Sequence, residues 1–145
     1  MTECSLSSDE WSDFGHMFIH TSIRTHDLEK SIGFYMNHLG MHVMSRREIP
    51  QNDAEIVFLQ DPERRGATLE LTLYRKQENF LQPDYDDRLF DHLAFEVKDM
   101  DATIAAMREE GVTITDEPFR LGLGGSTIAF VEDPDGTLIE LIQRA

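Results

Sequence analysis

The sequence repeats itself once, and this repeat limits the possible folds more than any other feature. When the second half is shifted by 72 residues onto the first, chemically distinctive residues coincide. The matched pairs are His20 with His92, Asp27 with Asp99, Phe58 with Phe130, Asp61 with Asp133 and Pro62 with Pro134. After Pro62 the first half holds two extra residues, so Glu70 aligns with Glu140. Self-similarity of this kind indicates a duplicated supersecondary unit.

Each copy predicts the same order of elements, a strand, a helix and then three strands. An alternating strand carries the histidine, at residues 17–24 and again at 91–97. The helices start after Asp27 and Asp99, and a glycine ends each of them. Their apolar stripes are Leu28, Ile32, Tyr35 and Leu39 in the first copy and Met100, Ile104 and Met107 in the second. The predicted fold class is α+β, with two tandem βαβββ modules whose curved mixed sheets form a cavity.

The repeat also predicts the division of the chain. The first module comprises residues 17–76 and the second module residues 90–145. The linker at 77–89 is polar and contains Pro83, so we expect it to lie outside both sheets. Residues 1–16 are polar and acidic without periodicity and are predicted to form a flexible arm.

Composition excludes several classes of partner. The formal net charge of −15 would repel nucleic acid and anionic membrane surfaces. Cys4 is the only cysteine, so neither an intrachain disulfide nor a cysteine-based metal site is possible, which suits the reducing cytosol. No apolar run approaches the roughly 18 residues that would cross a bilayer. We therefore expect a soluble, cytoplasmic protein.

Strand alternation predicts where two acids and two histidines point. In each last strand the glutamate, Glu70 or Glu140, stands between apolar residues that face the helix, so its carboxylate points to the opposite side. His20 and His92 leave the helix-packed side of their sheets in the same way. The four side chains can therefore face one cavity.

A divalent cation would explain why these acids are tolerated inside apolar strands. An isolated buried carboxylate costs several kcal/mol, and a metal held jointly with two imidazoles compensates it. Six-coordination would leave two positions for water or substrate oxygens. The alternative is structural, because a strand histidine is commonly a hydrogen-bonded core residue, a strand glutamate commonly lies on a wet face, and duplication copies such pairs. Spacing alone leaves both interpretations open.

The remaining histidines are weaker candidates. His38 and His42 have helical spacing, but Gly40 between them should end the helix, so we expect both to be surface residues. His26 is a similarly weak candidate, and His16 belongs to the arm.

Four segments resemble signatures of a known family. They are HTSIRTHDLEKSIGFYMNHLGM, LELT, DHLAFEV and AFVEDPDGTLIEL, and the resemblance runs from about residue 18 to residue 143. These segments are similar to the vicinal oxygen chelate superfamily, and specifically to glyoxalase I, the lactoylglutathione lyases. The resemblance implies a homodimer with each metal between subunits, bound by His20 and Glu70 of one chain and His92 and Glu140 of the other. It also implies Ni, Co or Zn in an octahedral site.

The resemblance further implies a reaction and the residues that carry it. In this family the hemithioacetal of methylglyoxal and glutathione becomes a lactoyl thioester by proton transfer through a metal-bound enediolate. Glu140 is then the expected catalytic base, with Glu70 as its counterpart on the opposite face of the substrate. Arg24 matches the arginine that contacts the γ-glutamyl carboxylate, and Arg88 a basic residue that some members place near the glycyl carboxylate. Both arginines could instead form ordinary surface ion pairs.

Two departures from the family pattern leave the thiol open. Tyr74 stands where glutathione-using members commonly have asparagine, and Leu123 where bacterial members often have lysine. Arg120, at the start of the same loop, is a candidate to replace the lost anion contact. The alternative functions are a methylmalonyl-CoA epimerase-like, extradiol dioxygenase-like or fosfomycin thiol transferase-like enzyme, and a non-catalytic small-molecule binding module.

Overall fold

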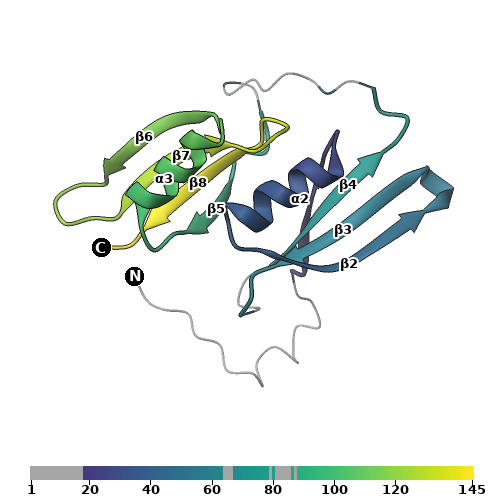
Figure 1. Ribbon diagram of the computed structural model, residues 1–145, viewed down its shortest axis with the longest axis horizontal. Helices are drawn as coiled ribbons and strands as arrows, with labels where there is room; N and C mark the ends of the chain where they lie inside the picture. The colour runs from purple at the N-terminus through teal and green to yellow at the C-terminus, as the bar shows by residue number, and fades with distance from the viewer. Residues whose placement is uncertain (1–17, 64–66, 79, 81–85, 87) are drawn as a thin grey trace.

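The computed structural model describes residues 18–63, 67–78, 80, 86 and 88–145. The first module consists of β1 (His20–Arg24), α2 (Leu28–Asn37), β2 (His42–Ile49), a 3-10 turn (Pro50–Asn52), β3 (Ala54–Gln60) and β4 (Thr68–Tyr74). The second consists of β5 (Leu93–Glu96), α3 (Met100–Glu109), β6 (Ile114–Arg120), β7 (Thr127–Glu132) and β8 (Leu138–Gln143). Figure 1 shows the two modules side by side. The predicted βαβββ order is confirmed in both.

The two sheets have the same topology. Their strand orders are β1-β4-β3-β2 and β5-β8-β7-β6, and in each sheet the first strand of the module is parallel to the last. The other neighbours are antiparallel. This arrangement brings the histidine strand of each module beside its glutamate strand, although the two are far apart in sequence.

Local signals at the helix ends act as expected. The Asp27 side chain accepts a hydrogen bond from the Lys30 backbone N–H at 3.1 Å, and the Asp99 side chain does the same for Ala102 at 3.0 Å. Such caps satisfy backbone donors that a helix start leaves unpaired. Gly40 has a φ of 68°, in the left-handed region that favours glycine. Helix α2 nevertheless ends at Asn37, with His38 as its C-cap, rather than at residue 39.

Both modules contribute to one hydrophobic core. Tyr35 of α2 and Met107 of α3 are fully buried in it, and the Tyr35 ring lies 6.2 Å from the Phe95 ring of β5. The Tyr35 hydroxyl also donates a 2.7 Å hydrogen bond to Asp133, which follows β7. Burial raises the pKa of Tyr35 well above its ordinary value of 10, and Asp133 raises it further. Helix α2 therefore joins the modules as well as covering its own sheet.

The first strand of each module begins later than its alternation suggests. Strand β1 starts at His20 instead of residue 17, and β5 starts at Leu93, so His92 precedes its strand. Alternation continues into Phe18 and Ile19, whose side chains are 73% and 60% exposed, although the Ile19 backbone oxygen still accepts a 3.2 Å hydrogen bond from the Thr68 N–H of β4. The described residues of the linker form no strand, while Pro83 and the arm lie outside the described residues.

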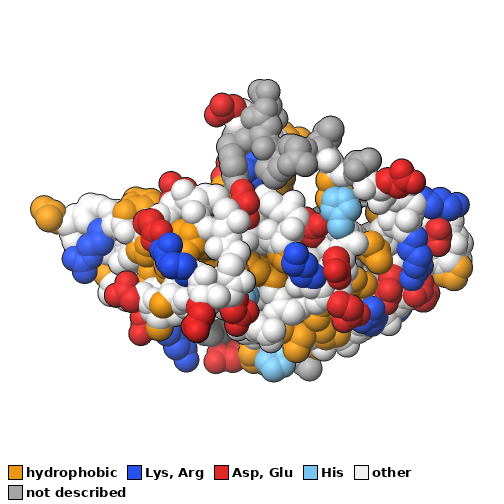
Figure 2. Space-filling model, turned by 45° about the horizontal axis from the view of Figure 1, so that its top comes forward, with side chains coloured by type: hydrophobic (Ala, Val, Ile, Leu, Met, Phe, Trp, Pro, Cys, Tyr) orange, Lys and Arg blue, Asp and Glu red, His pale blue; other side chains and the backbone are white. Residues whose placement is uncertain are grey.

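Acidic side chains are spread over the face drawn in Figure 2, with fewer basic ones between them. This distribution agrees with the net charge of −15. Within the described ranges, every helix is too short or too polar to cross a membrane.

Candidate metal and substrate site

The first candidate pair, His20 and Glu70, comes together on the side of its sheet away from α2. The His20 Nε2 atom lies 3.3 Å from the Glu70 Oε2 atom. Their strands are parallel neighbours with Ser22 opposite Glu70, so the two side chains lie on the same face of adjacent strands. Leu69 and Leu71 point into the core on the other face, as alternation predicts.

Two hydroxyl groups hold the Glu70 carboxylate. Ser22 Oγ donates to Glu70 Oε1 at 3.0 Å, and Thr72 Oγ1 donates to the same oxygen at 2.8 Å. The two hydroxyls also lie 3.0 Å from each other. One carboxylate oxygen is thus occupied by donors while Oε2 faces His20, which fixes the orientation of Glu70.

The second pair, His92 and Glu140, repeats the geometry with different surroundings. The His92 Nε2 atom lies 3.0 Å from Glu140 Oε2, and its Nδ1 atom lies 2.5 Å from the Asp91 carboxylate. A carboxylate on one ring nitrogen orients an imidazole and directs the other nitrogen outward. The positions equivalent to Ser22 and Thr72 hold Ala94 and Ile142, whose side chains have no donor for Glu140.

An aromatic ring supports each histidine. Phe58 lies 5.4 Å from the His20 ring in an edge-to-face arrangement, and Phe130 lies 5.8 Å from the His92 ring in the same way. The matched phenylalanines of the repeat therefore help to hold the matched histidines.

The two pairs do not merge within one chain. Among the described residues, no group of three or more His, Cys, Asp or Glu side chains is arranged to hold a metal ion. The reason is topological, because each pair is formed inside its own sheet by neighbouring strands. The shared cavity that alternation allows is therefore not formed by a single chain.

The donor atoms suit a first-row divalent metal. Each pair offers an imidazole nitrogen and a carboxylate oxygen directed at one another, a ligand combination that Zn, Ni and Co accept. Two donors are fewer than the four to six that such ions take. Each pair therefore fits half of a metal site.

Arg24 lies on the same sheet face as the first pair but farther along β1, and Arg88 lies beside the second pair. Arg24 is on β1, four residues after His20, and its Nη1 donates to Gln77 Oε1 at 2.8 Å. Its guanidinium carbon lies 4.6 Å from the centre of the Tyr74 ring. Arg88 Nη1 donates to the backbone oxygen of Asp91 at 3.2 Å, next to His92.

The loop after β6 also contains residues named from the sequence. Arg120 is the last residue of β6. Leu123 is fully exposed between Gly122 and Gly124, which both have positive φ. A leucine there offers no charge to an anionic ligand, so this loop lacks the basic group that the resemblance would place in it.

The expectation for His38 was wrong. Its side chain is only 9% exposed, and Nε2 lies 3.1 Å from Glu110 Oε2 of the second module. Because α2 is also the helix that contacts the second module, its C-cap residue is covered instead of facing solvent. His26 likewise pairs with Asp135 at 3.1 Å, whereas His42 is exposed as expected.

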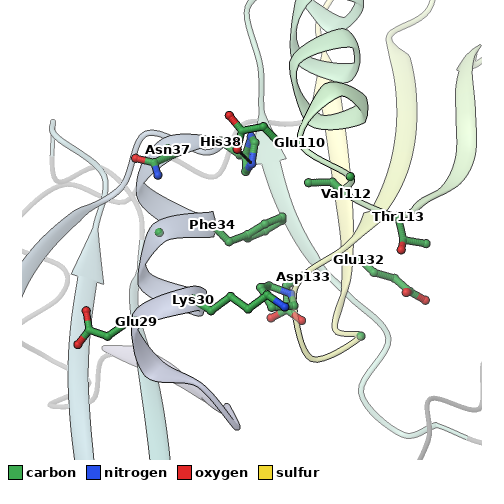
Figure 3. Close-up of a pocket in the computed structure, with 14 residues that line it drawn as sticks. Glu29, Lys30, Phe34, Asn37, His38, Glu110, Val112, Thr113, Glu132 and Asp133 are labelled. Atoms are coloured by element: carbon green, nitrogen blue, oxygen red, sulfur yellow. Dashed lines mark ion pairs between the residues drawn. The ribbon is translucent and has the colours of Figure 1, made fainter.

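A cavity of about 460 Å³ lies between α2 and the second module (Figure 3). Its lining includes Lys30, Phe34 and His38 on the α2 side and Glu110 and Asp133 opposite them. None of the four candidate ligands, His20, Glu70, His92 and Glu140, lines it. This cavity is therefore separate from the candidate metal ligands.

Comparison with known proteins gives the family. Residues 17–141 match the profile of the Glyoxalase/Bleomycin resistance protein/Dioxygenase superfamily. The chain belongs to this superfamily. The probable lactoylglutathione lyase of Synechocystis sp. is 38% identical over 129 residues, which are 88% of this chain and 95% of that protein. The putative lactoylglutathione lyase of Brassica oleracea var. gemmifera is also 38% identical over 129 residues, 88% of this chain, but the match covers only 44% of that longer protein.

Among solved structures, the trypanothione-dependent glyoxalase I of Leishmania major superposes with a TM-score of 0.72 at 35% identity. The match covers 88% of this chain and 86% of that one. The resemblance to glyoxalase I, and the fold expected from it, are therefore confirmed.

Proposed function

We propose that this glyoxalase-superfamily chain is a lactoylglutathione lyase of the glyoxalase I type, an enzyme that isomerises the hemithioacetal of methylglyoxal and a thiol to a lactoyl thioester. The observation that carries the proposal is the pair of matched His–Glu contacts, at 3.3 and 3.0 Å, on the open sides of two like sheets. Relatives named lactoylglutathione lyase at 38% identity favour this reaction over an epimerase, a dioxygenase, a thiol transferase or a binding module.

The complete site is proposed to form between two copies of the chain. Each chain carries two half-sites, so a two-fold dimer can join His20 and Glu70 of one copy with His92 and Glu140 of the other, twice. A divalent ion such as Ni, Co or Zn held by these four ligands would supply Lewis-acid chemistry, stabilising negative charge on the substrate oxygens.

The two glutamates have different proposed roles. Hydroxyls occupy one oxygen of Glu70 and fix its orientation, which suits a ligand. Glu140 has Ala94 and Ile142 at the equivalent positions, so its carboxylate has more freedom to rotate and accept a proton. We therefore assign Glu140 as the base that takes the proton from the substrate carbon, with Glu70 on the opposite face. A base already beside the carbon needs little movement to reach its proton.

The thiol is proposed to be anionic, with glutathione as the first candidate. Arg24 and Arg88 are the candidate contacts for its carboxylates, the first farther along β1 from its half-site and the second beside its half-site. The Leishmania major relative is described as trypanothione-dependent, so thiols differ among similar proteins. Tyr74 and Leu123 are the positions at which this chain departs from the glutathione-using pattern. The cytoplasmic location expected from the single cysteine stays a prediction.

The reaction is tested by adding methylglyoxal and glutathione to protein loaded with Ni, Co or Zn and following thioester absorbance. We expect turnover with at least one metal and a marked loss after chelation. Trypanothione in place of glutathione tests the second thiol. Absence of thioester with every metal and both thiols would refute the proposed reaction.

The shared site is tested by mixing two inactive variants, His20→Ala and His92→Ala. A heterodimer of these variants has one site with both defects and one site with neither. After free subunit exchange, half of the dimers are heterodimers, so about one quarter of the wild-type activity should return. If each site belonged to one chain, mixing would restore nothing. Each variant mixed with itself is the control.

A further inference from the structure

Arg24 is charged but is held by neutral partners. The chain has 28 acidic and 13 basic residues, so an arginine readily finds a carboxylate partner. Among the described residues, Arg46 pairs with Glu29 and Glu55, Arg75 with Glu48, Asp53 and Glu55, Arg108 with Glu117, and Arg144 with Glu96. Arg24 differs: among the described residues, it contacts the Gln77 amide oxygen and the Tyr74 ring. Neither contact neutralises the guanidinium.

The two contacts restrain the guanidinium in different directions. The Tyr74 ring covers one face at 4.6 Å, and Gln77 accepts one N–H at 2.8 Å. A guanidinium has five N–H donors in a plane, so one accepted hydrogen bond leaves donors for a carboxylate. Because the guanidinium plane is already held before the substrate arrives, binding a carboxylate costs less side-chain conformational entropy.

Arg24 lies on the same sheet face as the candidate metal ligands His20 and Glu70. Arg24 is four residues beyond His20 on β1, and Tyr74 is four residues beyond Glu70 on β4, so both lie on the face that carries the His–Glu pair. Four residues of strand correspond to about 13 Å. A ligand that reaches both places is elongated, with its reacting carbons at one end and an anionic group near the other.

We propose that Tyr74 and Gln77 are positioning residues, which hold the Arg24 guanidinium in place for the substrate carboxylate that the resemblance assigns to this arginine. The inference rests on the proposed function. It assigns a role to the tyrosine that stands where the family pattern commonly has asparagine, since an aromatic ring can orient the guanidinium by a cation–π contact. The substrate class is a thiol conjugate with a carboxylate remote from its sulfur.

The kinetic test compares three variants with glutathione hemithioacetal as substrate. Tyr74→Leu removes the ring and should raise KM about two- to five-fold with little change in kcat, the size of an exposed cation–π contact. Tyr74→Phe keeps the ring and should retain the wild-type KM. Gln77→Glu places a carboxylate beside Arg24 and should raise KM about ten-fold, because the guanidinium is then neutralised. Ala105→Glu, an exposed change on α3, controls for added negative charge.

Binding separates this inference from the proposed reaction. S-Methylglutathione is not a substrate, and calorimetry with the same variants measures its affinity directly. We expect Gln77→Glu and Tyr74→Leu to weaken binding by the same factors as they raise KM. An active enzyme whose KM and affinity are unchanged in both variants overturns the positioning role and leaves the reaction intact. If the variants weaken S-methylglutathione binding but the enzyme forms no thioester, the positioning of Arg24 is supported and the proposed reaction is refuted. A loss of kcat alone, with affinity unchanged, also overturns the receptor.

Discussion

The two modules have the same topology and the same His–Glu geometry, but they surround the glutamate differently. In the first module Ser22 and Thr72 both donate to Glu70. In the second module Ala94 and Ile142 stand at the equivalent positions, and a carboxylate, Asp91, contacts the histidine instead. One module thus orients its acid and the other orients its imidazole. The comparison teaches that a duplicated ligand pair can keep its geometry while its members take different roles.

The two helices differ in a second way. Tyr35 of α2 and Met107 of α3 occupy matched positions in the repeat, and both are fully buried. Tyr35 carries a hydroxyl that reaches Asp133 of the other module, whereas the Met107 thioether is a weak acceptor with no donor to offer. The same helix also presents His38 to Glu110. The first-module helix therefore provides polar contacts between the modules that its counterpart does not.

The largest expected effect concerns the two acids. Glu140→Gln should lower kcat by about 10²–10⁴-fold, the usual contribution of a positioned base. Glu70→Gln should cost activity mainly through weaker metal binding, so excess metal should restore part of it. Steady-state kinetics over a metal titration measures both. Equal losses in kcat at saturating metal would contradict the difference between the modules.

The next effect concerns Tyr35 and alkaline pH. Because its folded pKa is raised above 10, the unfolded chain releases the proton first, and stability should fall as pH rises through 10 and beyond. Tyr35→Phe should remove this pH dependence of stability. At neutral pH it should lower the free energy of unfolding by about 1.5–3 kcal/mol, because the hydrogen bond to Asp133 is lost. Urea unfolding at a series of pH values measures the difference from wild type. Met107→Leu, the matched position in α3, should leave the slope unchanged; a slope that persists in Tyr35→Phe would contradict the assignment.

Burial also affects Asp133, in a lower pH range. Desolvation raises the pKa of Asp133 above its ordinary value of 3.8, against the opposing effect of its hydrogen bonds. Its contribution to stability is therefore largest below 3.8 and declines as pH rises through the folded pKa. The stability difference between wild type and Asp133→Asn should accordingly change across this acidic range and become constant above it. A difference that is independent of pH would contradict the shift.

The helix caps should have smaller and equal effects. Asp27→Ala and Asp99→Ala each remove one capping hydrogen bond of similar length, so each should cost about 1 kcal/mol of unfolding free energy. Asp→Asn at the same positions should cost less. A clearly larger loss for Asp27→Ala would show that the start of α2 has an additional role between the modules.

The smallest expected effect tests the hydroxyls around Glu70. Thr72→Val keeps the shape of a buried side chain and removes one of the two donors to the carboxylate. With Ser22 still in place, we expect activity to fall less than ten-fold, at a cost of about 1 kcal/mol. Thr72→Ser should preserve activity. No change in either activity or metal affinity would mean that these hydroxyls do not orient Glu70.

Local and periodic features of the chain were predictable. Asp27 and Asp99 predicted the helix starts because capping depends on a few adjacent residues. Alternation around Glu70 and Glu140 predicted their faces, since successive strand residues point to opposite sides. The same reasoning placed β1 and β5 too early and His38 on the surface. Those errors share a cause, because strand pairing and burial depend on partners that are distant in sequence.

The sequence by itself determined the repeat, the order of elements in each copy and the chemical types of the four candidate ligands, because periodicity and spacing are local properties. Only the tertiary structure decided that His20 meets Glu70 and His92 meets Glu140 in two separate pairs, since parallel strand pairing selects neighbours within each sheet. It likewise decided that Tyr35 and His38 join the modules and that neutral groups hold Arg24. Such contacts depend on how the elements pack against one another, which no short stretch of sequence specifies.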